Sequence, residues 1–378
     1  MTRRVAFFAF DWGDAAVRRR VDGFAVDGIA VDGFAMHRGR ADRPDWVVAD
    51  LGETRDNAYL HRVTSIVRGA RRAVAERARL AAADMFLARN LDMLATAFLA
   101  RRMAGLATPV VYECLDIHRL MVREDMIGRA LRRAEGRMLS RSAGLWVSSP
   151  AFLTEYFERH QAGRYRAELI ENRMVPVAGL SLRPDPQETP DAARPLRLGW
   201  FGNLRCPRSL RLMEQLAAAF PGQLEIVLRG YPALGEIPDF EARVAACPGI
   251  QYGGRYKAPE ELGEIYDSVD LVWAGDFMDA GFNSTWLLPN RLYEGGWFAC
   301  PPIAPVEAQT GKWVVAHGAG FTIAEPIEDS LPALIAELIQ NRARITTAAR
   351  ALRGLPDSTF LLPPGAMAEQ VNRALAPD

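Results

Sequence analysis

The sequence is poor in cysteine and has no long apolar run, and both absences limit what the chain can be. The cysteines lie far apart and form no C-x-x-C pair, which argues against a disulfide framework or a zinc site and predicts buried thiols in a reducing compartment. They are Cys114, Cys206, Cys247 and Cys300. No stretch approaches 18 uncharged apolar residues, so we expect no transmembrane helix. The apolar run Val5–Phe10 is too short for a signal peptide, and we expect a cytoplasmic protein.

Two glycine-rich signatures are also missing. Neither G-x-G-x-x-G nor G-x-x-x-x-G-K-[ST] occurs, so the standard dinucleotide and P-loop fingerprints are absent. The chain has 46 basic and 46 acidic residues, and with no net field to attract nucleic acid we expect no such partner. Residues 1–178 nevertheless hold 29 arginines against 22 acidic residues, whereas residues 179–378 hold 17 basic against 24 acidic residues. The basic half predicts an anionic partner, such as a membrane surface or a phosphate-bearing acceptor, or else a solvated basic face.

A length of 378 residues predicts two domains, and the apolar pattern predicts an α/β fold in both. Short apolar runs bounded by polar turns alternate with amphipathic stretches, a pattern typical of βαβ units and parallel sheets. Strands are predicted at Val5–Phe10, from near Ile29, and at Trp46–Leu51, Met85–Ala88, Val110–Cys114, Gly144–Val147, Glu168–Ile170, Leu196–Phe201, Leu224–Arg229, Leu271–Ala274, Pro302–Ala304 and Gly320–Ile323. Helices are predicted at Tyr59–Ala82, Leu91–Met103, Met126–Ser140, Pro150–Arg159, Arg208–Phe220, Phe240–Ala246, Pro259–Ser268, Asn290–Phe298, Ser330–Leu352 and Pro364–Ala376.

A proline-rich segment separates the two halves. We therefore expect a first domain over residues 1–175, a linker over 176–195 and a second domain over 196–362. A last helix within 363–378 is expected to pack back on the first domain. Two doubly wound domains joined in this way would face each other across a cleft, which is a usual place for ligands.

Two segments of the second half suggest a binding site. In the first, a strand runs into Gly202 and Asn203 before a helix, so the glycine would let the backbone approach a phosphate near the helix N-terminus. This arrangement is common in α/β folds and is weak evidence alone. The second segment, residues 281–304, has a polar loop with Asn283 and Ser284 and then a helix that opens with Pro-Asn-Arg.

The helix of the second segment has side chains suited to a nucleotide. Asn290 and Arg291 would lie in its first turn, where N–H groups and a guanidinium can bind a diphosphate. Glu294 follows one turn later and could accept two hydroxyl hydrogen bonds from a ribose. A surface helix with an ordinary charge pair is the structural alternative.

This second segment resembles the donor-site helix of glycosyltransferases that have the GT-B fold and belong to the large retaining group 1 type. The family pattern P-[NS]-[KR]-[LIV]-x-E, then glycine, then P-[VP]-[IL]-[AG], matches Pro289 to Glu294 and Pro301 to Ala304. Further similarity to exopolysaccharide-assembly members of the succinoglycan type lies in Phe10-Asp11, Arg19-Arg20-Val21, Ala88-Arg89-Asn90 and Val111 to His118. The resemblance covers essentially the whole chain and implies two Rossmann-like domains, the first binding the acceptor and the second a nucleotide-sugar.

The resemblance also implies roles for residues of the second half. Glu294 would bind the donor ribose, and Arg291 with Gly202 and Asn203 would bind the diphosphate. Arg205 and Arg229 are further phosphate candidates, because each follows or ends a predicted strand. Family members often have a second glutamate eight residues before the ribose-binding one, where this chain has Trp286. Asp276 or Asp279 is a possible substitute.

Candidate acceptor and catalytic residues follow strands of the first half. Glu113, Asp116 and His118 lie at the carboxyl end of a predicted strand, the edge where ligands bind in a doubly wound sheet. A carboxylate there could deprotonate an acceptor hydroxyl in an inverting reaction, whereas in a retaining enzyme His118 would help position the donor sugar. Asp11 and Asp14 follow the first strand and are candidate acceptor contacts. Polar residues at the ends of strands are more often helix caps than catalytic residues.

Arginines recur at spacings of three and four in one predicted helix. They are Arg129, Arg132, Arg133, Arg137 and Arg141. Much of their charge would share one side and dock on an anionic membrane leaflet that holds a lipid-linked acceptor, at about 1 kcal/mol per basic group. The alternative is a solvated face with local acidic partners such as Glu135.

Taken together, these features favour a glycosyltransferase that moves a sugar from UDP or GDP to a saccharide or lipid-linked acceptor in bacterial exopolysaccharide synthesis. An Asp-x-Asp triplet is absent, and we expect no metal and no other cofactor. Retention of configuration is expected from the resemblance. Two alternatives stay open, namely a sugar-nucleotide epimerase of the same architecture and a catalytically silent scaffold subunit of a polysaccharide complex. The sequence does not identify the nucleotide base, the sugar or the acceptor.

Overall fold

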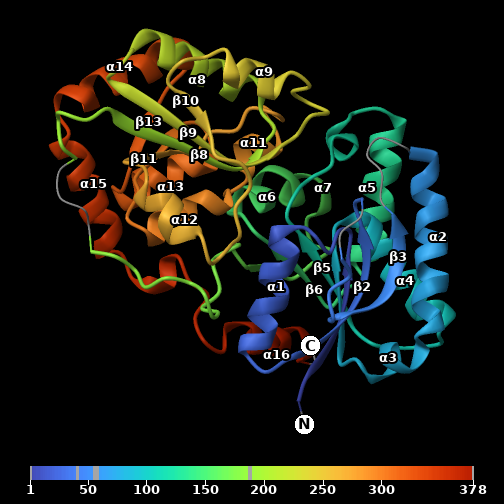
Figure 1. Ribbon diagram of the computed structural model, residues 1–378. Helices are drawn as coiled ribbons and strands as arrows, with labels where there is room; N and C mark the ends of the chain where they lie inside the picture. The colour runs from blue at the N-terminus through green and yellow to red at the C-terminus, as the bar shows by residue number, and fades with distance from the viewer. Residues whose placement is uncertain (1, 40–41, 54–58, 186–189, 377–378) are drawn as a thin grey trace. The chain divides into compact units, whose positions relative to one another are not determined.

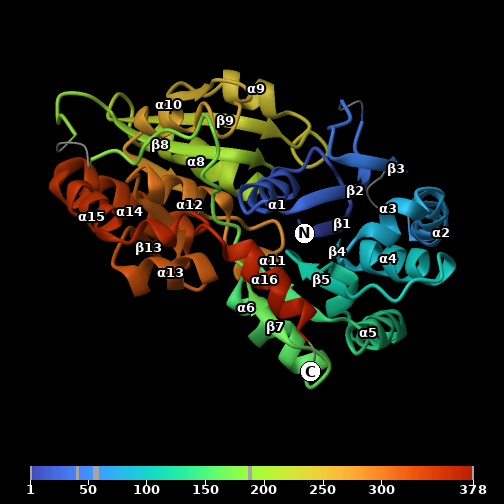
Figure 2. The ribbon, with the colours of Figure 1, turned by 90° about the horizontal axis from the view of Figure 1, so that it is seen from below.

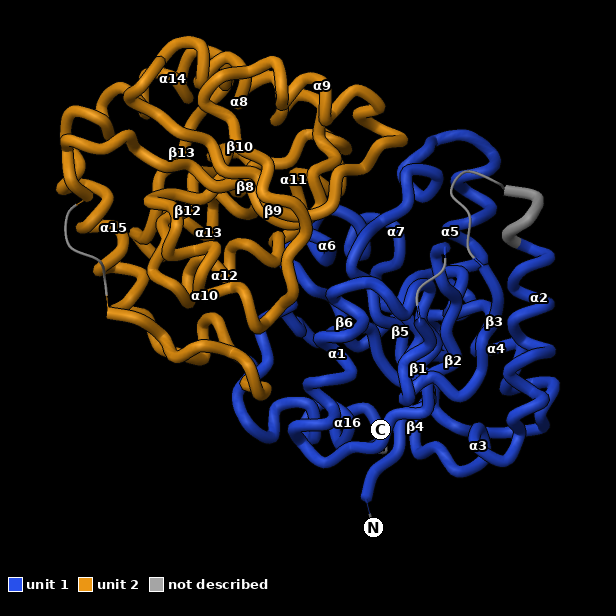
Figure 3. The backbone as a smooth tube through the Cα atoms, in the orientation of Figure 1, with its two compact units in different colours: residues 1–175, 362–378 blue, residues 176–361 orange. Residues whose placement is uncertain are grey.

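A computed structural model describes residues 2–39, 42–53, 59–185 and 190–376. The chain divides into two compact units, coloured separately in Figure 3. Unit 1 comprises residues 1–175 and 362–378, and unit 2 comprises residues 176–361. Residues 176–185 and 190–195 of the predicted linker thus belong to unit 2, and residues 186–189 lie outside the described residues.

Unit 1 is built on a sheet of seven parallel strands in the order β3-β2-β1-β4-β5-β6-β7. The strands are β1 (Arg4–Ala9), β2 (Ala30–His37), β3 (Val47–Glu53), β4 (Met85–Arg89), β5 (Val110–Cys114), β6 (Gly144–Val147) and β7 (Ala167–Leu169). Every strand predicted for this half is present, within two residues at its ends, because each is an apolar run bounded by polar turns.

Helices cover both faces of this sheet, with α1 and α16 on one face and α2 and α4 on the other (Figures 1 and 2). They are α1 (Ala15–Val26), α2 (Tyr59–Ala75), α3 (Arg77–Ala82), α4 (Leu91–Met103), α5 (Met126–Leu139), α6 (Pro150–Phe152), α7 (Glu158–Gln161) and α16 (Ala366–Leu375), with the shorter turns η1 (Arg119–Val122) and η2 (Leu153–Phe157). The predicted helix Tyr59–Ala82 is divided in two at Glu76. The last helix lies on α1, where backbone N–H groups at its first turn donate to the Asp27 carboxylate.

The tandem V-D-G repeat of residues 21–35 occupies three different settings. Its first copy lies in α1, its second turns the chain at Gly28, where φ is +70°, and its third lies in β2. A side chain at Gly33 is excluded, because a Cβ there would come within 2.3 Å of the Trp46 ring. The repeat is therefore helix, turn and strand in succession and forms no repeated structural unit.

Unit 2 has a six-stranded parallel sheet in the order β10-β9-β8-β11-β12-β13. Its six strands follow the same order as the first six strands of unit 1. The strands are β8 (Leu196–Leu204), β9 (Leu224–Pro232), β10 (Ile250–Tyr252), β11 (Leu271–Trp273), β12 (Pro302–Pro305) and β13 (Phe321–Ile323). The short strand β10 was not predicted. Two Rossmann-like sheets confirm the predicted α/β class.

The helices of unit 2 are α8 (Pro207–Ala219), α9 (Phe240–Ala245), α10 (Leu262–Asp267), α11 (Asn283–Trp286), α12 (Asn290–Trp297), α13 (Gln309–His317), α14 (Ile327–Gln340) and α15 (Ala343–Gly354), with a short turn η3 (Asp357–Thr359). Residues 330–352, predicted as one helix, form parts of α14 and α15 with a break at Asn341. The sequence pattern did not predict α11 or α13.

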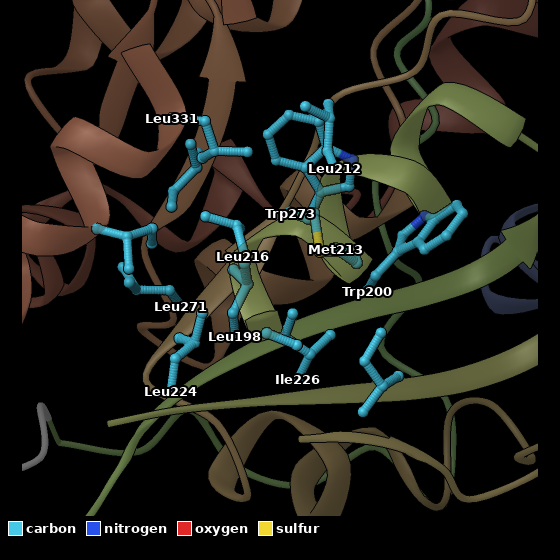
Figure 4. Close-up of a cluster of buried hydrophobic side chains, with 14 of the residues drawn as sticks. Leu198, Trp200, Leu212, Met213, Leu216, Leu224, Ile226, Leu271, Trp273 and Leu331 are labelled. Atoms are coloured by element: carbon cyan, nitrogen blue, oxygen red, sulfur yellow. The ribbon is translucent and has the colours of Figure 1, made fainter. Parts of the chain in front are cut away.

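An apolar core of unit 2 lies between its sheet and helices α8, α9, α14 and α15. Figure 4 shows Met213 and Leu216 of α8 beside Leu198 and Ile226, which project from neighbouring strands. Leu331 of α14 joins the same cluster. Helix α12 packs elsewhere, against β8 and β12, so its polar residues lie beside the strand ends rather than in this core.

Candidate functional site

The carboxyl edge of the unit 2 sheet holds a cluster of charged side chains. The Arg205 guanidinium donates to Oδ2 of Asp276 through Nη2 at 2.9 Å, and the Ser284 hydroxyl donates to Oδ1 at 3.1 Å. Burial raises the pKa of Asp276, but Arg205, the Met278 amide and Arg291 outweigh burial and hold that pKa below the usual aspartate value. The ionised carboxylate therefore joins two residues predicted for donor binding, Arg205 and Ser284.

Arg291 adds a second guanidinium group to this charged cluster. It is only 9% exposed, and its Nη1 and Nη2 donate to the carbonyls of Phe201 and Gly275 at 3.2 and 3.0 Å. Phe201 lies near the end of β8 and Gly275 follows β11, so Arg291 joins the start of α12 to two neighbouring strands. Its Nε is buried without a hydrogen-bond partner. The site thus has two guanidinium groups and one carboxylate, an excess of positive charge suited to a diphosphate.

Glu294 lies one turn further along α12 and is 4% exposed. Its Oε2 accepts a hydrogen bond from the Tyr266 hydroxyl at 3.2 Å. Asn290 is the first residue of α12 and is partly exposed, whereas Asn283 is buried at the start of α11. The residues predicted from residues 281–304 therefore lie on two consecutive helices at one edge of the sheet.

Gly202 and Asn203 have a different setting from the one expected. Strand β8 does not end at Phe201 but continues to Leu204, and these two residues pair with Gly230 and Tyr231 of β9. The backbone comes very close there, since a Cβ on Gly230 would lie 2.0 Å from the Gly202 carbonyl oxygen. The predicted glycine turn into a helix is therefore wrong, although Gly202 has φ of +97° at the strand end.

Arg229, the last of the predicted phosphate ligands, projects from β9. Its Nη2 donates to the Arg255 carbonyl at 3.3 Å and to Oε2 of Glu261 at 3.2 Å, while Nε is buried without a partner. Arg229 therefore holds the loop after β10 in place. No described contact joins it to the cluster of Arg205 and Asp276.

In unit 1 the strand ends carry a buried ion triad. Oε1 of Glu113 accepts from Nε of Arg20 at 2.7 Å, and its Oε2 accepts from Nε of Arg89 at 2.8 Å. All three side chains are 5% exposed or less. Burial raises the pKa of Glu113, but Arg89 and Arg20 outweigh burial and hold it below the usual glutamate value. A buried carboxylate with both oxygens engaged is a weak base, so its chemistry favours holding the two arginines together.

This triad was not predicted from the sequence. Met85, Leu87 and Arg89 share one face of β4, as alternate residues of a strand do, and Val111 and Glu113 share the same face of β5. A charge that ends an alternating apolar series was the signal available in the sequence. The partner on α1, Arg20, is 93 residues from Glu113 and carries no such signal.

Asp116 and His118 lie in the loop that follows β5. Asp116 is exposed, and His118 is partly exposed. The backbone N–H of Leu120 donates to Nδ1 of His118 at 3.2 Å, which places the proton of the neutral ring on Nε2. The ring is therefore held at the start of η1 with its Nε2 side as the hydrogen-bond donor.

The two aspartates after β1 have local partners. Asp14 is the N-cap of α1 and accepts from the backbone N–H groups of Ala16 and Val17. Asp11 accepts from the Gly13 N–H at 3.0 Å and lies 3.7 Å from Nε of Arg38. Burial raises the pKa of Asp11, and the Gly13 amide and Arg38 offset only part of that rise. Asp14 thus caps α1, and its contact with the acceptor stays a prediction.

A small cavity of unit 2 lies elsewhere, at the beginnings of β11 and β12, bounded by Asp270 and Cys300. Ligands of doubly wound sheets bind at the opposite, carboxyl edge. We therefore assign the candidate site to the charged cluster and not to this cavity.

Comparison with known proteins agrees with this architecture. The chain is 37% identical over 345 residues to the succinoglycan biosynthesis protein ExoL of Rhizobium meliloti (strain 1021), covering 89% of this chain and 85% of ExoL. HepE of Anabaena, solved with UDP and glucose, matches with a TM-score of 0.69 at 16% identity over 99% of both chains. Sucrose-phosphate synthase of Thermosynechococcus elongatus matches with a TM-score of 0.73 at 13% identity over 98% of both chains. No family model matches. The chain therefore belongs to the family of the succinoglycan biosynthesis protein ExoL and has the GT-B fold.

Proposed function

We propose that this protein is a glycosyltransferase that moves a hexose from a UDP-sugar onto a saccharide or lipid-linked acceptor in exopolysaccharide synthesis. The observation that carries the proposal is the cluster of Arg205, Asp276 and Arg291 at the carboxyl edge of the unit 2 sheet, one helical turn from Glu294. Arginine pairs bind diphosphates well, and a buried carboxylate can accept the two ribose hydroxyls. UDP and UDP-glucose bound to HepE, and the name of ExoL, support the same assignment.

The leaving diphosphate is stabilised without a metal in this proposal. Arg205 and Arg291 provide fixed positive charge, and the first turn of α12 adds backbone N–H groups. Preorganised charge of this kind acts on the bond that breaks, because negative charge grows on the diphosphate as the sugar leaves. Transfer with retention, unaffected by EDTA, is the expected behaviour.

In unit 1 we assign acceptor and sugar positioning to Asp116 and His118. The Nε2–H of His118 can donate to a sugar hydroxyl, because Nδ1 is engaged by the backbone. Asp116, exposed after β5, is the carboxylate able to accept a proton or a hydroxyl hydrogen bond. Asp11 contributes to acceptor binding, and Glu113 has a structural role, since it holds Arg20 of α1 and Arg89 of β4.

Contact with an anionic membrane forms part of the proposal and rests on α5. Arg129, Arg133, Arg137 and Arg141 are exposed, and Met126 and Ile127 at the start of the helix are 78% and 54% exposed. Basic side chains beside exposed apolar ones suit the surface of an anionic bilayer.

Two residues of this helix differ from the sequence prediction. Arg132 is buried and its Nη1 donates to the Met121 and Arg123 carbonyls, so it does not share the basic face. Glu135, named as a local partner in the alternative of a solvated face, is also buried. None of the helices among the described residues has the length and apolar character needed to cross a bilayer. Flotation with vesicles containing anionic lipid tests the contact, and Arg129→Glu/Arg133→Glu should lose it. Equal flotation with neutral vesicles would contradict it.

The test of the donor site is a thermal-shift screen with UDP, GDP, ADP, CMP and their sugar conjugates. A nucleotide at a hundred times its Kd adds about 2.7 kcal/mol of stability, or roughly 5–10 °C for a unit of this size. UDP should stabilise the wild type, and Glu294→Ala should lose the shift, whereas Glu264→Ala on the neighbouring helix α10 should keep it. If no nucleotide stabilises the protein, the donor site is wrong and the scaffold alternative gains support. Epimerised nucleotide-sugar formed without an acceptor would favour the epimerase alternative.

A further inference from the structure

Phe282 in unit 2 presents an aromatic ring to solvent from a hydrogen-bonded turn. It is 41% exposed, and of the residues that the structure describes it is the only exposed phenylalanine or tryptophan. Tyr231, also exposed, has the Arg255 guanidinium 4.6 Å from its ring centroid. A single exposed apolar side chain is common on proteins, so the argument depends on how this ring is held and what lies beside it.

Hydrogen bonds hold the turn that carries Phe282. The N–H of Phe282 donates to the Asp279 carbonyl at 2.9 Å, and its own carbonyl accepts from the Thr285 N–H at 2.8 Å. The preceding Gly281 has φ of +83° and donates to Oγ1 of Thr285 at 3.1 Å. The Trp286 ring packs edge-on against Phe282, with 6.0 Å between centroids and 88° between planes. The exposed ring is therefore preorganised, and binding to it costs little conformational entropy.

The same turn is attached to the cationic cluster. Ser284, two residues after Phe282, donates its hydroxyl to Asp276 at 3.1 Å and accepts from the Asp279 N–H at 2.9 Å. Asp276 in turn holds Arg205. One short loop thus connects an exposed aromatic ring to the groups that bind the diphosphate in the proposed function.

The aromatic pair also includes a position at which the chain differs from the group 1 pattern that residues 281–304 resemble. Trp286 lies eight residues before Glu294, where the glycosyltransferases that this segment resembles often have a second glutamate. A buried indole cannot accept the hydroxyl hydrogen bonds that a carboxylate would accept. Pyranose rings have a second means of recognition, because their C–H bonds form an apolar face that packs on an aromatic ring.

We propose that Phe282, supported from the side by Trp286, forms the subsite on which the C–H face of the donor hexose stacks. The inference rests on the proposed function, since it places the sugar of the same UDP-sugar beside the diphosphate cluster. Stacking replaces hydrogen bonds from a carboxylate, so the subsite selects for a pyranose with a continuous C–H face rather than for one hydroxyl pattern.

The experiment measures Kd by calorimetry for UDP and for UDP-glucose, UDP-galactose, GDP and GDP-mannose. Wild type, Phe282→Ala, Phe282→Tyr and the matched control Val315→Ala are compared; Val315 is an exposed apolar residue of α13 in the same unit. For Phe282→Ala the Kd of the sugar conjugate should rise roughly 2- to 12-fold, the fold change equivalent to an aromatic contact of 0.5–1.5 kcal/mol. The Kd of the free nucleotide should change less than about twofold, as should all Kd values for the tyrosine and control variants.

Saturation-transfer NMR gives a second measurement that does not depend on affinity alone. In wild type the C–H protons of the bound glucose should receive saturation from aromatic protons, and in Phe282→Ala that transfer should fall while the uridine signals persist. Equal weakening of UDP and UDP-glucose, or no weakening of either, would overturn the subsite while leaving the donor site intact. A wild-type protein that binds none of these nucleotides would overturn the proposed function and this inference with it.

Discussion

Replacing Glu113 by glutamine should destabilise unit 1 strongly, although the side chains differ by one atom. Glu113 is 1% exposed and neutralises two guanidinium groups, those of Arg20 and Arg89, through hydrogen bonds of 2.7 and 2.8 Å. The amide of glutamine keeps the shape and loses the charge. Two buried cations then lack a counter-ion, and breaking a buried ion pair from one side costs about 3–5 kcal/mol.

The structure argues for the upper part of that range. Nη1 and Nη2 of Arg89 are already buried without hydrogen-bond partners, so Glu113 provides the one described hydrogen bond of this guanidinium. With an m-value of about 2 kcal/mol/M, the urea midpoint should fall by roughly 2–2.5 M. Hydrogen exchange of peptides covering β4 and β5 follows this unit alone, which matters because two units can unfold separately.

Two further variants separate stability from chemistry. Asp116→Asn alters an exposed carboxylate three residues away and should change stability by less than about 0.5 kcal/mol while lowering sugar transfer. Adding Arg89→Met to Glu113→Gln removes one of the uncompensated cations and should recover about 1 kcal/mol or more. A Glu113→Gln protein with an unchanged urea midpoint and no transfer activity would refute the structural role and support a catalytic one.

Burial raises the pKa of Glu135 to about 7, so between pH 4.5 and 7 the folded protein binds more protons than the unfolded chain and stability falls as pH rises. Glu135→Gln should remove this pH dependence, so its free energy of unfolding should rise relative to that of wild type by up to about 3 kcal/mol between pH 5 and pH 8. Urea unfolding at both pH values measures this difference. Parallel pH profiles of the two proteins would contradict the prediction. Gly230→Ala places a Cβ 2.0 Å from the Gly202 carbonyl oxygen and should cost about 1–3 kcal/mol and weaken UDP binding. Gly235→Ala, where no atom lies within 4 Å of the added Cβ, is the control, and equal thermal midpoints for the two variants would show that the strand ends can separate.

Part of the fold follows from local pattern. Val110–Cys114 and Leu91–Met103 have the predicted limits because one is an apolar run between turns and the other is an amphipathic stretch after an asparagine cap. The strand Ile250–Tyr252 escaped prediction, since three residues are too few to show a period. The break at Asn341 escaped it as well, because the apolar spacing of α14 resumes in α15.

The candidate site shows the same division. By itself the sequence determined that Ser284, Arg291 and Glu294 share one segment at a strand end, because a motif fixes spacing along the chain. Only the tertiary structure decided that Arg205 and Ser284 meet on Asp276, and that Glu113 lies between arginines 93 and 24 residues away. Strand order and helix packing bring those partners together. The low polarity around them then strengthens the interaction between their charges. Local pattern contains neither the distance between remote residues nor their burial, so it cannot distinguish a base from a buried counter-ion.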